Sequence, residues 1–202
     1  PHIYPKSIED IKIPVPSMTA QKKIINKFQK LYDTIEKINH LSKELEEQKN
    51  LILDIHINNK CLSFFKLVEI CNMLKTTKHC TNIANKKGKY RFYNSSQKDK
   101  LYLDTYEVEE ESIIIGNGGN LCVHIDNKFT PSKHVTVIQS KDNNRISNKY
   151  IYQYLLNKIN ILKNESVGIT IKWLNKTKIK NIEIPVPSIK KQKELLSDIE
   201  IL

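Results

Sequence analysis

The sequence predicts an α+β fold, in which one globular domain of mostly antiparallel strands with small helices is flanked by long coiled-coil helices. Three observations support this. The phrase IPVPS occurs at residues 13–17 and again at 184–188. Residues 18–56 contain no proline or glycine and repeat apolar residues at steps of three and four, which is typical of a coiled coil. Residues 61–187 instead alternate short β-type runs with turn signals.

The first segment, residues 1–16, reads as a turn and a short strand that end at the first IPVPS. The sequence starts with Pro1 and not with methionine. We therefore expect the chain to be a fragment or a processed product of a longer protein.

A long helix is predicted over residues 17–60. Ser17 is a favourable N-cap residue, and Gln21 can reach back toward it. About 40 residues at 1.5 Å each make a rod of roughly 60 Å. Ser42 and Gln48 interrupt the apolar seam, so an identical parallel helix is not the expected partner; an ordinary amphipathic helix packed on a domain is the alternative. The predicted interface residues are Ile24, Phe28, Leu31, Ile35, Ile38, Leu45 and Ile52.

Residues 61–187 are predicted to form the globular domain, and 188–202 to begin a second coiled-coil helix. A helix over 148–160 and a strand-like piece at 168–171 complete the domain. The β-type runs are FFKLVEI (64–70), KYRFY (89–93), SIIIG (112–116), LCVHI (121–125) and HVTVIQ (134–139).

The two IPVPS phrases belong to a longer repeat. Residues 8–24 align without gaps on residues 179–195, and each residue lies 171 positions before its counterpart. The second proline of each phrase lacks an N–H and restricts the residue before it, so the strand ends there and the serine cap starts a helix. The repeat therefore predicts the same joint between a globular domain and a helical rod, used twice.

The charge is +11, from 33 Lys and Arg against 22 Asp and Glu. Ten of the basic residues lie in residues 60–100, which contain only two acids. This block favours a polyanionic partner, most simply nucleic acid; a well-solvated lysine-rich surface is the alternative.

No catalytic motif is present. The chain lacks a phosphate-binding GxxxxGK loop and the NPP-aromatic motif of amino-methyltransferases, and its six histidines have no HExxH spacing. The glycine-rich stretch 116–120 is better explained as a turn between strands. Cys71, His79 and Cys80 lack a second close pair of ligands, so we expect free thiols and no metal site. No run is apolar enough to span a membrane. The chain is predicted to bind and not to catalyse.

Residues 86–100 alternate lysines and an arginine with aromatic side chains and end in small polar residues. The basic side chains suit phosphates, and the small polar ones suit the edges of DNA bases. Residues 117–120, 132–134 and 168–178 offer further polar and basic groups. The predicted DNA-contacting residues are Lys87, Lys89, Arg91, Tyr93, Asn94, Ser95, Ser96, Gln97, Lys98, Asn117, Asn120, Lys133, His134, Thr170 and Lys172. Trp173 is expected in the core or at a hinge.

The layout resembles the specificity (S) subunit of type I restriction–modification systems. The resemblance covers nearly the whole chain, and GITIKWLNKTKIKNIEIPVPS (168–188) is its most specific part; KLVEIC (66–71), YRFYNSS (90–96) and SIIIGNGGN (112–120) add to it. It implies that 61–187 is a target recognition domain that reads one half of a bipartite DNA site. It also implies that 1–16 is the tail of a preceding recognition domain, and that the long helices pair antiparallel and set the spacing between half-sites.

The resemblance further implies double-stranded DNA and modification (methyltransferase) subunits as partners, with a restriction subunit and self-association through the helices as further options. The chain itself would bind no cofactor. S-adenosylmethionine, ATP and Mg²⁺ are expected on partner subunits, in the cytoplasm. Two alternatives stay open: a coiled-coil interaction protein whose basic domain binds DNA or an acidic partner without reading sequence, and a domain of a fused restriction–methylation enzyme.

Overall fold

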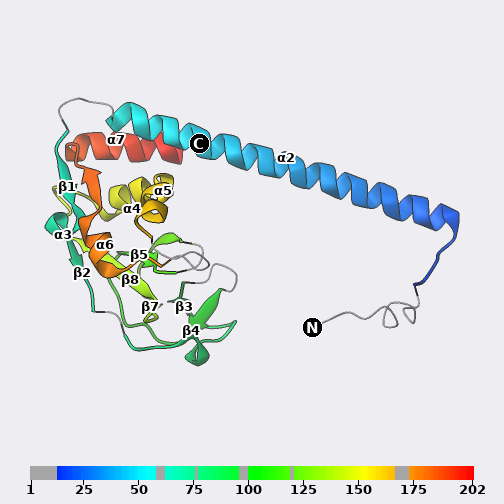
Figure 1. The fold of residues 1–202 in the computed structure, drawn as a ribbon, viewed down its shortest axis with the longest axis horizontal. Coiled ribbons are helices and arrows are strands. Elements are labelled where there is room, and N and C mark those ends of the chain that lie inside the picture. Colours follow the sequence, from blue (N-terminus) through cyan, green and yellow to red (C-terminus); the bar gives the residue numbers. More distant parts are fainter. Residues whose placement is uncertain (1–12, 58–61, 76, 96–99, 119–120, 167–172) are drawn as a thin grey trace. The chain divides into compact units, whose positions relative to one another are not determined.

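The computed structural model describes residues 13–57, 62–75, 77–95, 100–118, 121–166 and 173–202. The chain divides into two compact units, Pro1–Leu45 and Glu46–Leu202. A long helix and antiparallel strands with small helices are both present (Figure 1), so the α+β prediction is confirmed.

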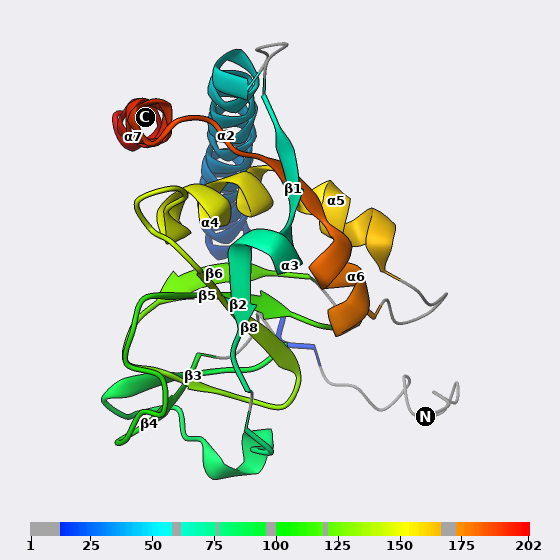
Figure 2. The same cartoon turned by 90° about the vertical axis from the view of Figure 1, so that its left-hand side faces the viewer.

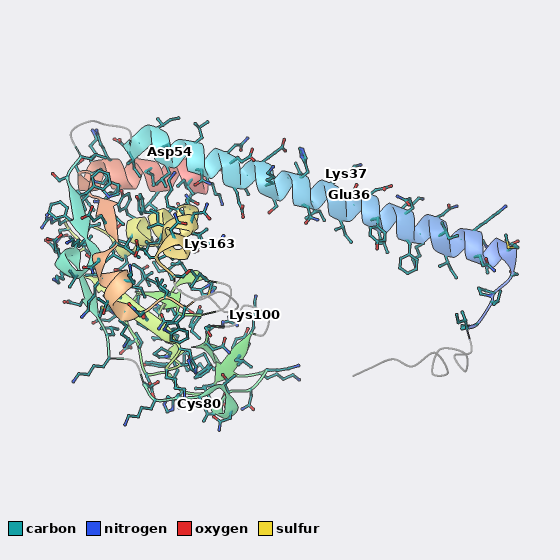
Figure 3. The ribbon with its side chains drawn as sticks, viewed as in Figure 1. Glu36, Lys37, Asp54, Cys80, Lys100 and Lys163 are labelled. Carbon is teal, nitrogen blue, oxygen red and sulfur yellow. The ribbon has the colours of Figure 1, made fainter. Side chains whose placement is uncertain are left out.

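Helix α2 spans Met18–Ile57. It starts where the sequence predicts: the backbone N–H of Ala20 donates to the Ser17 hydroxyl at 3.4 Å, and Gln21 donates from Nε2 to the Pro16 carbonyl at 2.8 Å. Glu36 and Lys37 project from its exposed surface (Figure 3). In the part that belongs to the first unit, the predicted seam residues Ile24, Phe28, Leu31, Ile35 and Ile38 are 47–59% exposed.

The end of α2 belongs to the second unit and behaves differently. Leu53 is fully buried in the main apolar core, and the predicted seam residue Ile52 packs against that core. Asp54 forms an ion pair with Lys158, with 2.7 Å between its Oδ1 and the lysine Nζ. The same helix therefore presents an open apolar stripe along most of its length and a buried one at its C-terminal end.

Within the described residues, the strands of the domain form three small sheets. One has the strand order β2-β8-β5-β6, a second has β4-β3-β7 and a third has β1-β9. All pairs are antiparallel except β3 with β7. The strands are β1 (Phe64–Lys66), β2 (Cys71–Met73), β3 (Tyr90–Tyr93), β4 (Leu101–Leu103), β5 (Ser112–Gly116), β6 (Val123–Asp126), β7 (Thr130–Pro131), β8 (Val135–Ser140) and β9 (Glu183–Pro185).

The central strand β5 is buried along its whole length because both of its faces are covered. Ile113 and Ile115 belong to the main core, whereas Ile114 belongs to a second cluster with Phe129 and Val137. Alternating side chains of one strand thus contribute to two cores. The helices are α3 (Leu67–Ile70), the 3-10 turn η1 (Thr81–Ile83), α4 (Asn148–Asn157), α5 (Ile159–Glu165), α6 (Lys176–Asn181) and α7 (Ile189–Glu200). Helix α4 packs on β5 and β6 (Figure 2).

Two predicted elements are divided in the structure. The run 64–70 was expected as one strand, but it forms β1 and then the short helix α3. Its turn is stabilised by Glu69, whose Oε2 accepts the backbone N–H of Lys66 at 2.6 Å. The helix expected over 148–160 ends at Asn157, and α5 starts at Ile159. The strand expected at 168–171 lies outside the described residues.

The C-terminal joint closes the domain. Strand β9 pairs with β1, and Ser188 caps α7 by accepting the backbone N–H of Lys191 at 3.5 Å. Helix α7 runs beside the end of α2 in the opposite direction (Figure 1), and Leu195 and Ile199 share the core with Leu53.

Candidate nucleic-acid interface

Arg91 is the central residue of the candidate interface. It lies on β3 directly opposite Tyr102 of β4, and its guanidinium carbon is 5.2 Å from the ring centroids of both Tyr93 and Tyr102. Among the described residues its Nη1 is buried and has no hydrogen-bond partner. An unpaired buried donor is unfavourable, so a rearrangement that brought this group to an acceptor would be favourable.

Tyr93, Asp126 and His124 surround Arg91 in this cluster. Tyr93 donates its hydroxyl to Asp126 at 2.8 Å, which engages this carboxylate, and burial raises the pKa of Tyr93, with Asp126 adding to the shift and Arg91 opposing it. The His124 ring is 5.2 Å from that of Tyr93. Burial, and then the charge of Arg91, lower the pKa of His124, so His124 is neutral at pH 7 and Arg91 is the cation of this cluster.

Exposed lysines flank this cluster. Lys87 and Lys89 precede β3, and Lys89 places its amino group 5.2 Å from the ring centroid of Tyr90. Lys128, which follows β6 with a positive φ of 53°, lies over the Tyr106 ring at 5.9 Å. Long cationic side chains of this kind suit phosphate contacts that do not depend on sequence.

Three exposed lysines of the described residues, Lys75, Lys78 and Lys128, were absent from the predicted set. Lys75 and Lys78 lie in the basic block of residues 60–100, and this block was the signal that could have found them. Lys128 carried no such signal, because it is a single basic residue outside that block. Only the fold places it over the Tyr106 ring.

A second group of predicted residues meets at the end of β5. Asn117 is only 4% exposed, and its Oδ1 accepts the hydroxyl of Thr136 at 2.9 Å. Its backbone N–H donates to the His134 carbonyl, and its carbonyl accepts the N–H of Leu174. The side chain of Asn117 therefore shapes this turn, and its oxygen is already engaged.

Trp173, the only tryptophan of the chain, lies at the same turn. Gly118 forms a β-bridge with it, and the His134 ring packs edge-on against the indole at 6.2 Å between centroids. Trp173 is 41% exposed, so the core position expected for it is not observed. Of the predicted contact residues here, His134 is half-buried and Lys133 is exposed.

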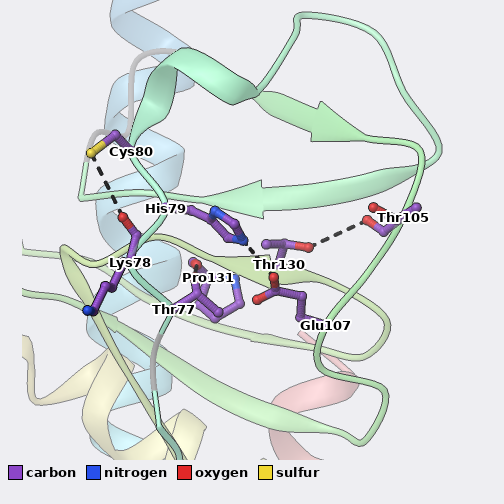
Figure 4. A network of polar contacts seen from close by, with 8 residues as sticks. All are labelled: Thr77, Lys78, His79, Cys80, Thr105, Glu107, Thr130 and Pro131. Carbon is purple, nitrogen blue, oxygen red and sulfur yellow. Dashed lines mark hydrogen bonds and ion pairs between the residues drawn. The ribbon is translucent and has the colours of Figure 1, made fainter.

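The segment before η1 is fixed to the loops around it by polar contacts (Figure 4). Thr77 donates its hydroxyl to the Pro131 carbonyl at 2.7 Å, and His79 Nε2 is 2.6 Å from Glu107 Oε1. The N–H of Lys133 donates to the carbonyl of His79 at 3.1 Å. The basic segment and the acidic run after β4 are thus joined at His79 and Glu107.

The three cysteines that the structure describes do not belong to a metal-ligand cluster. Cys71 is buried, and this burial raises the pKa of its thiol to about 12, whereas Cys80 is exposed (Figure 3). Within the described ranges no three His, Cys, Asp or Glu side chains are grouped to hold a metal ion. Among the same residues, no helix is long and apolar enough to cross a membrane.

The described ranges include nine of the fifteen predicted contact residues. Of these, Asn94 and Ser95 are half-buried directly after β3. The others lie outside the described residues: Ser96, Gln97, Lys98, Asn120, Thr170 and Lys172.

Comparison with solved structures shows the same fold in type I restriction–modification proteins. The S subunit from M. genitalium matches with a TM-score of 0.57 and 18% identity, over 71% of this chain and 39% of that chain. The HsdS subunit from Thermoanaerobacter tengcongensis matches with a TM-score of 0.55 and 13% identity, over 100% of this chain and 55% of that chain. A third structure comes from work on complex assembly and conformational transition of the type I R-M system. It matches with a TM-score of 0.56 and 14% identity, over 94% of this chain and 53% of that chain.

The chain thus spans about half the length of these structures or less. No curated protein matches its sequence. The family model for the type I restriction modification DNA specificity domain matches residues 1–47 and 59–201, which is nearly the whole chain. The chain therefore belongs to the type I restriction modification DNA specificity domain family.

Proposed function

We propose that this chain reads one half of a bipartite site in double-stranded DNA, as the recognition component of a type I restriction–modification enzyme. Membership of the DNA specificity family and the charge of +11 support this proposal. In this role the chain has no catalytic centre and no cofactor of its own. Methyl transfer from S-adenosylmethionine, and ATP-dependent restriction, are the tasks of partner subunits in the cytoplasm.

The observation that carries the proposal is the Arg91 guanidinium. Tyrosine rings lie at equal distances from it, its Nη1 has no hydrogen-bond partner among the described residues, and exposed lysines flank its strand. A planar guanidinium whose position is restricted by aromatic rings suits directed hydrogen bonds to the acceptors of a base edge, and guanine O6 and N7 are the commonest such pair. Lys87 and Lys89 are suited to hold the phosphates on either side.

The long helix supplies the other half of the proposal. The apolar stripe of α2 between Ile24 and Ile38 is exposed, so it is available to a second helix that pairs with it and sets the distance between two recognition domains. We propose that modification subunits dock on these paired helices. Pairing between two copies of this chain is the alternative arrangement.

Replacement of Arg91 tests sequence readout. Wild-type protein should select a consensus with a fixed block of a few bases from random duplexes. Arg91→Ala should weaken binding to that consensus by about 10- to 100-fold, the value of one bidentate base contact, and change binding to random DNA far less. Arg91→Lys keeps the charge without the planar fork, so it should lose the preference at one base and retain binding to random DNA.

Lys87→Ala is the matched control, because it removes one positive charge next to the same strand. It should weaken binding to all sequences by a similar factor. If wild-type protein bound random DNA tightly and selected no consensus, the chain would be a basic interaction module, the rival function that its charge also supports. If Arg91→Lys left every position of the consensus unchanged, Arg91 would not be a base-reading residue.

A further inference from the structure

Gln192 lies at the point where the recognition domain meets helix α7. Its side chain is completely buried. Its Nε2 donates to the carbonyls of Pro187 and Arg145, both at 2.9 Å, and its Oε1 accepts the backbone N–H of Ser147 at 3.0 Å. One amide thus joins the first turn of α7 to the proline phrase before it and to the turn that begins α4.

The repeat provides an internal comparison for these three bonds, because Gln21 is the counterpart of Gln192 in the first copy. Gln21 also donates from Nε2 to the second proline of its phrase, Pro16, at 2.8 Å. Among the described residues this is the only hydrogen bond of the Gln21 side chain, which remains partly exposed. The bond to the proline carbonyl therefore belongs to the joint itself, and the other two bonds of Gln192 belong to the attachment of the domain.

Two apolar positions of the repeat are also exposed in the first copy and packed in the second. Val15 is 80% and Ile24 is 47% exposed in the first copy. Their counterparts Val186 and Leu195 pack in the main core of the domain. The first copy forms a hollow lined by Pro14, Val15, Pro16, Gln21, Ile24 and Ile25. The helix starts in the same way in both copies, with a serine cap and a glutamine bound to the proline carbonyl. These local contacts therefore do not determine how a domain is seated.

The groups that Gln192 binds are themselves fixed in the domain. Ser147 is the N-cap of α4, and its hydroxyl accepts the N–H of Tyr150 at 3.2 Å. The guanidinium of Arg145 lies over the Phe65 ring of β1 at 4.6 Å, and β1 pairs with β9, the strand that leads into the joint. A rotation of α7 about the joint would therefore break the two bonds from Gln192 to this rigid turn.

We propose that Gln192 is a positioning residue that fixes the orientation of the recognition domain on its helix, and thereby the separation of half-sites that the assembled enzyme accepts. This inference rests on the proposed function. Consecutive bases of a strand are about 3.4 Å apart along the DNA axis, so a tilt that moves the reading surface by a few ångström would admit a neighbouring spacer length. Gln192 has no direct contact with DNA in this role; it acts through the turn at Arg145 and Ser147.

The range of spacer lengths that the enzyme accepts distinguishes a positioning role of Gln192 from a purely stabilising one. The specificity protein is assembled with its modification subunits, and methylation rates are measured on duplexes whose half-sites have the preferred spacer, one base pair less and one base pair more. Gln192→Leu preserves most of the volume and removes all three bonds. It should raise the rate on the neighbouring spacers relative to the preferred one by a factor of about 5 to 30, the equilibrium effect of losing one or two kcal/mol. The selected half-site sequence should not change.

Ser188→Ala is the matched control. It removes the hydroxyl group that caps α7 by accepting a hydrogen bond from the same helix. The variant leaves the hydrogen bonds of Gln192 in place. It should lower the melting temperature and keep the spacer profile of the wild type. Gln192→Met serves as a second variant if Gln192→Leu does not fold, because methionine fills an irregular buried space with less strain.

The outcomes are distinct. If the Gln192 variants slow methylation at every spacer by the same factor, or if Ser188→Ala changes the spacer profile equally, Gln192 has only a structural role and the inference is overturned. A wild-type enzyme that accepts all spacers equally would also overturn it, while half-site reading would stand. A wild-type protein that selects no DNA sequence would instead contradict the proposed function.

Discussion

At the scale of single residues, a few buried polar groups hold the domain to its C-terminal joint. Tyr150 of α4 is fully buried, and its hydroxyl donates to the carbonyl of Pro185 in the second IPVPS at 2.8 Å. Burial raises the pKa of Tyr150, and the neighbouring Tyr154 adds to the shift. The phenol is therefore a permanent hydrogen-bond donor over the pH range in which the protein works.

Tyr150→Phe should lower the free energy of unfolding by about 1–3 kcal/mol, because it leaves the Pro185 carbonyl buried without this donor. The value is measured by chemical denaturation. Tyr152→Phe is the control: Tyr152 lies on the same helix but is only partly buried, and its change should stay within about 0.5 kcal/mol. Equal losses in the two variants would mean that the bond to Pro185 contributes nothing specific.

At the scale of elements, helix α2 has two kinds of apolar surface. The seam from Ile24 to Ile38 is exposed, whereas Leu53 near the C-terminal end is fully buried beside Leu195 and Ile199 of α7. A burial of this kind stabilises the chain itself, whereas an exposed seam contributes only when a partner covers it.

Leu53→Ala should therefore destabilise the isolated chain by about 2–5 kcal/mol, the usual range for a buried leucine. Phe28→Ala, on the exposed seam, should change its stability by less than about 0.5 kcal/mol. Urea denaturation of the chain at low concentration gives both values. A large loss for Phe28→Ala under these conditions would show that the seam is already covered, either within the chain or by a second copy.

At the scale of the whole molecule, the excess of positive charge is distributed unevenly. Exposed lysines accompany β3 and the loops before it, and the acidic run that follows β4 is tied back through Glu107 to His79. In the proposed function, this distribution attracts DNA electrostatically to one part of the domain, where Arg91 is proposed to read its sequence.

The double variant Lys87→Ala, Lys89→Ala should make the plot of log Kobs against log salt concentration shallower by about 0.9 for each phosphate contact that is lost. Relative preferences among DNA sequences should stay the same. Lys190→Ala, which removes a charge from α7 beside Glu194, is the control and should preserve the slope. An unchanged slope in the double variant would remove these lysines from the interface.

Much of the fold follows from local sequence. The start of α2 at Ser17, the β5–β6 pair on either side of the glycine-rich stretch, and the restart of a helix after Ser188 were all predicted, because caps, prolines and glycines act within a few residues. The family itself could be inferred from the doubled joint and the motifs around it, and the family model confirms it.

The details of the candidate site were less predictable, because they depend on residues far apart in the chain. Asn117 was predicted from its polarity, yet Thr136 engages its amide oxygen. Trp173 was expected in the core or at a hinge, yet it is not in the core: it is 41% exposed and packs against His134. Two of the three partners of Gln192, Arg145 and Ser147, lie more than forty positions away and carried no local signal at all.

The sequence by itself therefore determined the order of the parts: a rod, a basic recognition domain, and the same joint at the start of two helices. These features are encoded in periodicity, charge and backbone restriction, which act along the chain. Only the tertiary structure decided which polar groups are exposed and which are used to hold the domain on its helix. That choice depends on burial and on partners brought together by folding, as the two glutamines show: both follow the phrase IPVPS at the same spacing, and only Gln192 has the described domain against it.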